Sequence, residues 1–147
     1  AMDRRRSLPL RRLAPLAGIA GISLVSLQMG TYTEQLRDVP AGMRLYDPME
    51  SVRDMDDTAA LIAGLDVVVS VDTSVAHLAG AMGCPVLLLD RFDNCWRWRS
   101  GRTDSPWYPG LRIIRQIRAG EWENVVHRLC SMLARRDLPP SLLPARG

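Results

Sequence analysis

DVVVSVDTSVAHLAGAMGCPVLLL, residues 66–89, is the stretch that decides the fold of this 147-residue chain. The β-branched run Val67–Val71 is typical of a central parallel strand that is covered on both faces. Small and apolar residues from Ser74 to Met82 then predict a helix, which Gly83 and Pro85 end. Val86–Leu89 predicts the next buried strand. This strand–turn–helix–strand order favours an α/β protein with a parallel sheet.

The rest of the chain continues the alternation. Hydrophobic spacing predicts four further helices, over residues 10–20, 31–37, 54–64 and 121–136. Three further strands are expected, over residues 22–27, 43–46 and 111–114. We therefore expect a Rossmann-like parallel sheet with helices on both faces, in one domain over residues 3–136. Residues 137–147 are expected to form a frayed, Pro-rich tail.

Composition excludes several classes of protein. An apolar content of 47% argues against wholesale disorder, and a net charge of +3 is too small to indicate nucleic-acid binding. No apolar run approaches the ~20 residues of a membrane span. The three cysteines, Cys84, Cys95 and Cys130, fit neither a zinc spacing nor a disulfide framework. We expect a cytoplasmic setting and no metal or cofactor.

A polar turn, Asp72-Thr73-Ser74, stands where the first strand of the quoted stretch meets its helix. Ligands of open α/β sheets bind at such carboxyl ends. One interpretation is only a capping turn, with Thr73 or Ser74 as the N-cap. The other is that the free N–H groups near Ser74 and Val75 hold a diphosphate. Asp72 would then bind a sugar hydroxyl, and His77 would face the same ligand from the first helical turn.

A long irregular segment, residues 90–110, is rich in aromatic and basic side chains. One interpretation is packing, in which four aromatic residues fix the loop on the sheet: Trp96, Trp98, Trp107 and Tyr108. The other is ligand binding, in which the tryptophans shape a pocket and arginines contact phosphate oxygens through paired hydrogen bonds. The candidate arginines are Arg97, Arg99 and Arg102.

These motifs together resemble a known family. The quoted stretch, Trp96-Arg97-Trp98 and residues 104–109 are similar to the C-terminal region of glycosyltransferase family 9-like proteins, as are residues 6–10 and 25–28. That group includes the heptosyltransferases and, more similar still, bacterial tetratricopeptide-repeat proteins with a glycosyltransferase-like domain. The resemblance covers about residues 3–136. It implies the C-terminal half of a GT-B fold, in which two Rossmann-like domains enclose the active site.

The resemblance also implies a function. Asp72, Thr73, Ser74 and His77 fall on the loop and helix start that bind a nucleotide-sugar donor, and Val75 lies between them. Heptosyltransferases usually have Gly where this chain has Ser74, whereas the tetratricopeptide-linked relatives tolerate Ser. We therefore expect the donor-binding portion of a glycosyltransferase that transfers a sugar to the hydroxyl of a sugar or protein acceptor.

Two parts of the family pattern find no match in this sequence. One is the acceptor-binding domain with its catalytic base, so we expect no catalytic residue here and no turnover by this chain alone. The other is the first strand of the donor domain, whose loss would leave an exposed sheet edge suited to a homodimer. The alternative function is a non-catalytic protein-interaction module that retains the fold.

Overall fold

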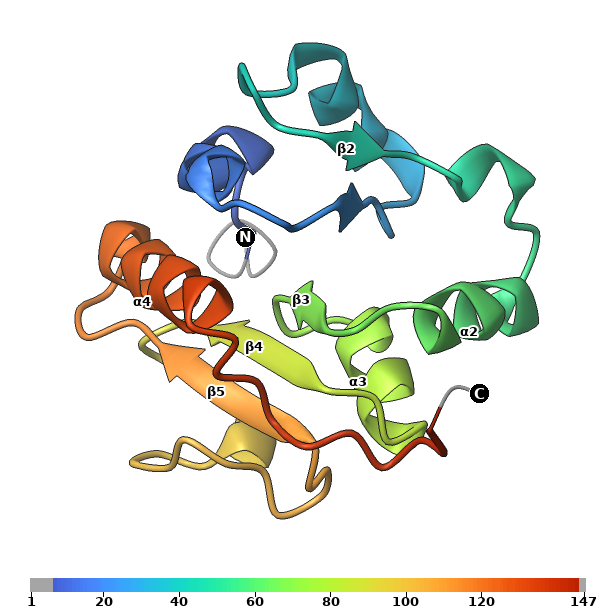
Figure 1. Cartoon of the computed structure of the whole chain (residues 1–147). Helices are drawn as coiled ribbons and strands as arrows, with labels where there is room; N and C mark the ends of the chain where they lie inside the picture. Colours follow the sequence, from blue (N-terminus) through green and yellow to red (C-terminus); the bar gives the residue numbers. More distant parts are fainter. Residues whose placement is uncertain (1–6, 146–147) are drawn as a thin grey trace.

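The computed structural model describes residues 7–145, in which strands and helical segments alternate along the chain (Figure 1). The strands are β1 (Leu24–Val25), β2 (Leu45–Tyr46), β3 (Val68–Ser70), β4 (Val86–Asp90) and β5 (Leu111–Arg115). Each lies within or beside a segment that the sequence predicts to be a strand. Within the described residues every strand pair is parallel, which confirms the α/β class.

The helical segments are of two kinds. The α-helices are α2 (Met55–Ala63), α3 (Ser74–Ala81) and α4 (Trp122–Ala134). The 3₁₀ helices are η1 (Leu10–Gly18), η2 (Gly30–Asp38), η3 (Met49–Ser51) and η4 (Trp96–Trp98). None of the helices in residues 7–145 is long and apolar enough to cross a membrane.

Hydrogen bonding divides the described strands between two sheets. The smaller sheet pairs β1 with β2, and the larger has the order β3-β4-β5. In the larger sheet Val68 pairs with Val86, and Val86 in turn pairs with Leu111. The helices η3 and α2, with short loops, lead from β2 to β3, and no described strand pairs with both β1 and β3. The described strands therefore form two separate sheets, with the break between β1 and β3.

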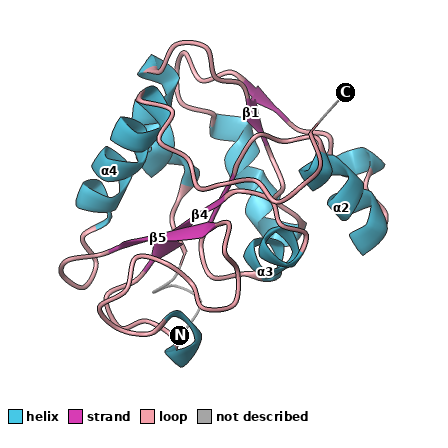
Figure 2. Ribbon diagram, turned by 60° about the horizontal axis from the view of Figure 1, so that its bottom comes forward, coloured by secondary structure: helices cyan, strands magenta, loops and turns pink. Residues whose placement is uncertain are grey.

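Alternate residues of β4 face two separate cores, because successive side chains of a strand point to opposite faces. Val86 and Leu88 pack in a cluster with side chains of α2 and α3, whereas Leu87 and Leu89 pack in a cluster with side chains of η1 and α4. Figure 2 shows α3 and α4 on opposite sides of β4. Helices on both faces are thus confirmed.

The C-terminal tail is ordered where the sequence predicts fraying. Pro139 is buried, and the Leu142 N–H donates to the Gly83 carbonyl over 2.8 Å. Leu138 and Leu143 pack against the two cores. The prediction of a frayed tail is therefore wrong as far as Leu143, because Leu138 and Leu143 find apolar partners on the folded domain.

Candidate functional site

The start of α3 leaves backbone donors open. Thr73 is the N-cap with extended backbone angles, φ −139° and ψ 170°, and within residues 7–145 its side chain makes no capping hydrogen bond. Its hydroxyl lies 3.0 Å from the Ser70 hydroxyl instead. The Thr73 carbonyl accepts from the N–H groups of Ala76 and His77, so the first helical bonds form after Ser74 and Val75. Uncapped N–H groups at a helix start attract anions.

Asp72 lies next to this helix start, between the side chains of His77 and Arg97. Its carboxylate is 3.4 Å from His77 Nε2 and 3.7 Å from Arg97 Nη2. The Asp72 side chain is only 16% exposed. The carboxylate that would otherwise repel an anion at α3 is therefore paired with the Arg97 guanidinium, which has the opposite charge.

His77 is fixed on both ring nitrogens and on one face. Its Nδ1 lies 3.0 Å from the Tyr108 hydroxyl, opposite the contact of Nε2 with Asp72. The imidazole stacks on the fully buried Trp98 ring, with centroids 5.1 Å apart and planes 22° apart. These contacts agree with the packing interpretation for Trp98 and Tyr108, whereas ligand binding by the loop stays a prediction.

Tyr108 contacts the predicted site residue His77, although the sequence analysis names it only as a packing residue. The sequence feature that could have indicated this contact is Gly80 in α3. A Cβ at that position would lie 2.7 Å from the Tyr108 ring. Glycine at this position lets the aromatic loop approach α3 closely enough for the hydroxyl to reach His77. A small residue on the helix therefore marks where the loop docks.

The three candidate arginines have different surroundings. Arg97 reaches Asp72, and its guanidinium carbon lies 5.8 Å from the centroid of the Trp96 ring, which is 74% exposed. Arg102 forms two hydrogen bonds with Asp104, of 2.9 and 2.7 Å. Arg99 adopts a positive φ of 47°. The structure thus brings Arg97 to the start of α3, whereas Asp104 holds the guanidinium of Arg102.

A buried ion pair holds the aromatic loop on the sheet. Asp90 ends β4 and is 2% exposed, and the Nε of Arg115 on β5 donates to it over 2.8 Å. The same guanidinium donates to the carbonyls of Trp98, Arg99 and Arg102 at 2.9–3.2 Å. Burial raises the pKa of the Asp90 carboxyl, against the lowering effect of the Arg115 hydrogen bond and charge.

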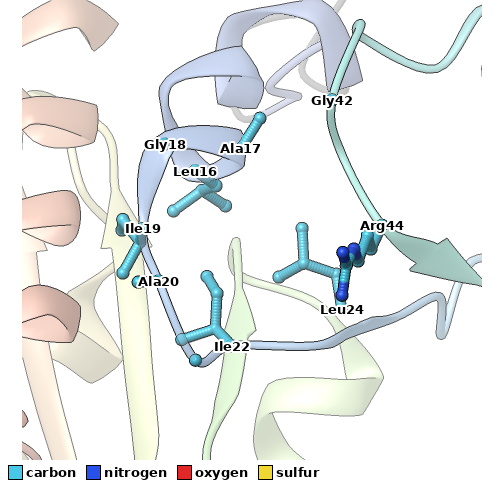
Figure 3. A pocket seen from close by; sticks show the side chains of 10 residues that line it. Leu16, Ala17, Gly18, Ile19, Ala20, Ile22, Leu24, Gly42 and Arg44 are labelled. Atoms are coloured by element: carbon cyan, nitrogen blue, oxygen red, sulfur yellow. The ribbon is translucent and has the colours of Figure 1, made fainter.

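Two cavities border the smaller sheet. One, of about 340 Å³, is lined by residues of η1 and β1 with Arg44 at its edge (Figure 3), and none of the predicted site residues lines it. The other, of about 1220 Å³, lies between β1 and β3 and includes Thr73, Ser74 and Val75 in its lining. The start of α3 therefore opens into the larger cavity.

Comparison with known proteins shows the family of this chain. The sequence model of glycosyltransferase family 9 (heptosyltransferase) matches residues 52–126, just over half of the chain. The chain belongs to glycosyltransferase family 9. The matched residues contain both the start of α3 and the aromatic loop, so the side chains described above lie within the family region.

A curated relative extends the similarity beyond that region. The chain is 30% identical over 141 residues to Protein FlbA of Caulobacter vibrioides. The alignment covers 93% of this chain but 23% of that protein, so the chain spans less than a quarter of the length of this relative.

Proposed function

We propose that this family 9 domain binds the nucleotide-diphosphate sugar donor of a glycosyltransferase, with the diphosphate at the start of α3. The observation that carries the proposal is the helix start itself, where Ser74 and Val75 follow an N-cap without a side-chain hydrogen bond and border the cavity of about 1220 Å³. Backbone N–H groups and the helix dipole together favour a negatively charged ligand there.

The neighbouring side chains suit the chemistry of sugar transfer. When the acceptor hydroxyl attacks the sugar, the bond to the diphosphate breaks and negative charge grows on the leaving oxygen. Arg97 and the α3 N–H groups would stabilise that charge. Asp72 would accept a hydrogen bond from a sugar hydroxyl, and His77 would donate to the ligand after exchanging one of its present contacts.

The acceptor and the base that deprotonates it would come from polypeptide outside these residues. This chain covers 23% of Protein FlbA, so a further domain fits the length of that relative. The acceptor would be a hydroxyl of a sugar or a protein. We accordingly expect no sugar transfer by the 147 residues alone, and measurable turnover would contradict that assignment.

A second candidate is a non-catalytic module that retains the fold and binds another protein. One observation favours it: the Asp72–His77–Tyr108 network is complete without a ligand, since both imidazole nitrogens of His77 have protein partners. In this case the residues stabilise the loop on α3, and nucleotides do not bind.

Calorimetric titration distinguishes the two functions. UDP, GDP, ADP, ADP-heptose and UDP-N-acetylglucosamine would each be titrated into the wild-type chain and into Asp72→Ala and His77→Ala. Saturable binding of a nucleotide, weakened in both variants, supports the donor site. Absence of binding in a sample that unfolds cooperatively supports the protein-interaction module.

A pair of substitutions at Ser74 makes the test specific for the helix start. Ser74 is exposed at the first position of α3, so Ser74→Asp would place a carboxylate where it stabilises the helix by about 0.3–1 kcal/mol. The same carboxylate would compete with a diphosphate for the N–H groups. Ser74→Asn has a similar shape without the charge. The proposal predicts that Ser74→Asp loses nucleotide binding without losing thermal stability, whereas Ser74→Asn keeps both; equal binding by the two variants contradicts it.

A further inference from the structure

His77 is held more firmly at one ring nitrogen than at the other. Its Nδ1 lies 3.0 Å from the Tyr108 hydroxyl, within the usual range of a hydrogen bond. Its Nε2 lies 3.4 Å from Asp72 Oδ1, which is beyond that range. The His77 side chain is 31% exposed, so the ring is partly open to solvent. Nε2 is therefore the nitrogen whose contact a ligand can replace more readily.

Several contacts fix Tyr108 in place. Its ring packs so closely on α3 that a Cβ at Gly80 would lie 2.7 Å from it. Its backbone N–H donates to the Ser105 hydroxyl over 3.3 Å, and its carbonyl accepts from the Leu111 N–H over 3.0 Å. Leu111 begins β5, so the sheet itself anchors this tyrosine. The phenol hydroxyl thus stands at a fixed point beside α3.

The plane of the His77 imidazole is fixed as well. The fully buried Trp98 ring stacks on it with centroids 5.1 Å apart, and the Tyr108 ring lies at 68° to it with centroids 5.8 Å apart. Turning the imidazole over about its bond to Cβ would leave this stacking intact but would place ring carbons where the two nitrogens now lie. The hydrogen bonds, rather than the packing, therefore decide which way the ring faces.

Asp72 determines which nitrogen of His77 carries a hydrogen. An ionised carboxylate only accepts hydrogen bonds, and the other oxygen of Asp72 faces the Arg97 guanidinium at 3.7 Å. Nε2 of His77 therefore carries a hydrogen. In the neutral ring Nδ1 then has none and accepts from the Tyr108 hydroxyl, whereas in the cation Nδ1 has one and the hydroxyl turns to accept it. Nε2–H is thus present in both charge states of the ring.

We propose that Tyr108 is a positioning residue for donor binding, which holds Nδ1 of His77 so that Nε2–H donates to an oxygen of the diphosphate. This inference rests on the proposed donor function. A diphosphate oxygen accepts hydrogen bonds as a carboxylate oxygen does, so it takes the place of Asp72 Oδ1 without any change in the protonation of the ring. Asp72 then accepts from a sugar hydroxyl, while the contact between Tyr108 and Nδ1 persists.

The first variant that tests this role is Tyr108→Phe, which keeps the ring against α3 and removes only the hydroxyl. Nucleotide affinity of the full chain is measured by calorimetric titration with UDP, GDP and ADP. Loss of one hydrogen bond that orients the donor is expected to weaken binding about 2- to 12-fold. Tyr46→Phe is the matched control, because Tyr46 lies on β2 and is 66% exposed, and this variant should bind as the wild type does.

A double-mutant cycle separates positioning from general packing. If Tyr108 acts through His77, its hydroxyl has nothing to hold once the imidazole is gone. Tyr108→Phe should therefore weaken binding in the wild type but have no further effect in His77→Ala. Losses that add across the two sites would contradict the positioning role and leave the donor site standing. Absence of nucleotide binding by the folded wild type would contradict the donor function, and this role with it.

Two further variants show which nitrogen of His77 meets the ligand. The amide nitrogen of His77→Gln reaches about as far as Nε2, whereas that of His77→Asn reaches only about as far as Nδ1. The proposal predicts that His77→Gln retains more nucleotide affinity than His77→Asn, and the reverse order overturns it.

Imidazole ¹⁵N spectra of the chain give a readout that needs no ligand. The chain has two histidines, and the exposed His127 serves as the internal reference. The Nδ1 resonance of His77 should move in Tyr108→Phe, because its hydrogen-bond partner is lost, while the resonances of His127 stay unchanged. An Nδ1 resonance that is the same in Tyr108→Phe and in the wild type would show that the hydroxyl does not hold the ring, and the proposal would be wrong.

Discussion

Arg115→Met tests whether one buried guanidinium holds the aromatic loop in place. Arg115 is paired with the buried carboxylate of Asp90 and donates to three loop carbonyls. Methionine has a similar length and keeps apolar contacts, but it removes all four hydrogen bonds. The change therefore leaves Asp90 unpaired in the interior and frees the loop that carries Trp98.

The magnitude follows from the unpaired carboxylate. Removing one partner of a buried ion pair costs about 3–5 kcal/mol, of which we take about 4 kcal/mol. The entropy of unfolding is roughly 2.1 cal/mol/K per residue, or about 0.31 kcal/mol/K for 147 residues. The thermal midpoint of Arg115→Met is thus expected to fall by about 13 °C.

The effect should depend on pH in a defined direction. Burial raises the pKa of Asp90 in the wild type, and loss of the Arg115 charge raises it further. In folded Arg115→Met, Asp90 then binds a proton more tightly than it does in the unfolded chain. The stability of the variant therefore decreases as pH rises, and this decrease is complete above the pKa of Asp90 in the folded variant. The difference from the wild type should shrink as pH falls.

Differential scanning calorimetry at several pH values measures this effect, with two comparison variants. Arg112→Met removes a guanidinium from the same strand, but one paired with the exposed Asp137, so it should change the midpoint little. Asp90→Asn combined with Arg115→Met removes the uncompensated charge and should recover part of the loss. The reasoning is refuted if the thermal midpoint of Arg115→Met is no lower than that of Arg112→Met. It is also refuted if the difference in midpoint between Arg115→Met and the wild type does not depend on pH.

Two further substitutions test the contacts between the loop and α3. Gly80→Ala places a Cβ 2.7 Å from the Tyr108 ring, and such overpacking should lower the free energy of unfolding by about 1–3 kcal/mol. The control is Gly18→Ala, because nothing lies within 4 Å of a Cβ at that position. Equal thermal midpoints in the two variants would contradict the close approach of Tyr108 to α3. Trp98→Ala removes a fully buried ring and should cost about 3–5 kcal/mol in denaturant unfolding. Trp96→Ala, at a ring that is 74% exposed, should be nearly neutral, and a similar loss in both tryptophan variants would show that burial does not decide their roles.

The sequence predicts those elements whose local pattern is strong. The Val-rich strand, the helix at Ser74 and the strand at Val86 all form within one or two residues of their predicted bounds. The expected strand over residues 22–27 shortens to Leu24–Val25. Its hydrophobic pattern is adequate, but strand pairing depends on a neighbour, and β1 has a described partner on one side only.

Side-chain partners were harder to predict, because they depend on contacts between distant parts of the chain. His77 meets Tyr108 across 31 residues, and no spacing in the sequence indicates that pairing. Arg97 and Arg102 are arginines of the same loop, and the sequence analysis treats both as candidates for phosphate contacts. Only Arg102 has an acidic residue two positions away, Asp104, and this carboxylate binds its guanidinium. The order in the C-terminal tail has the same origin, since Leu142 depends on the Gly83 carbonyl for its partner.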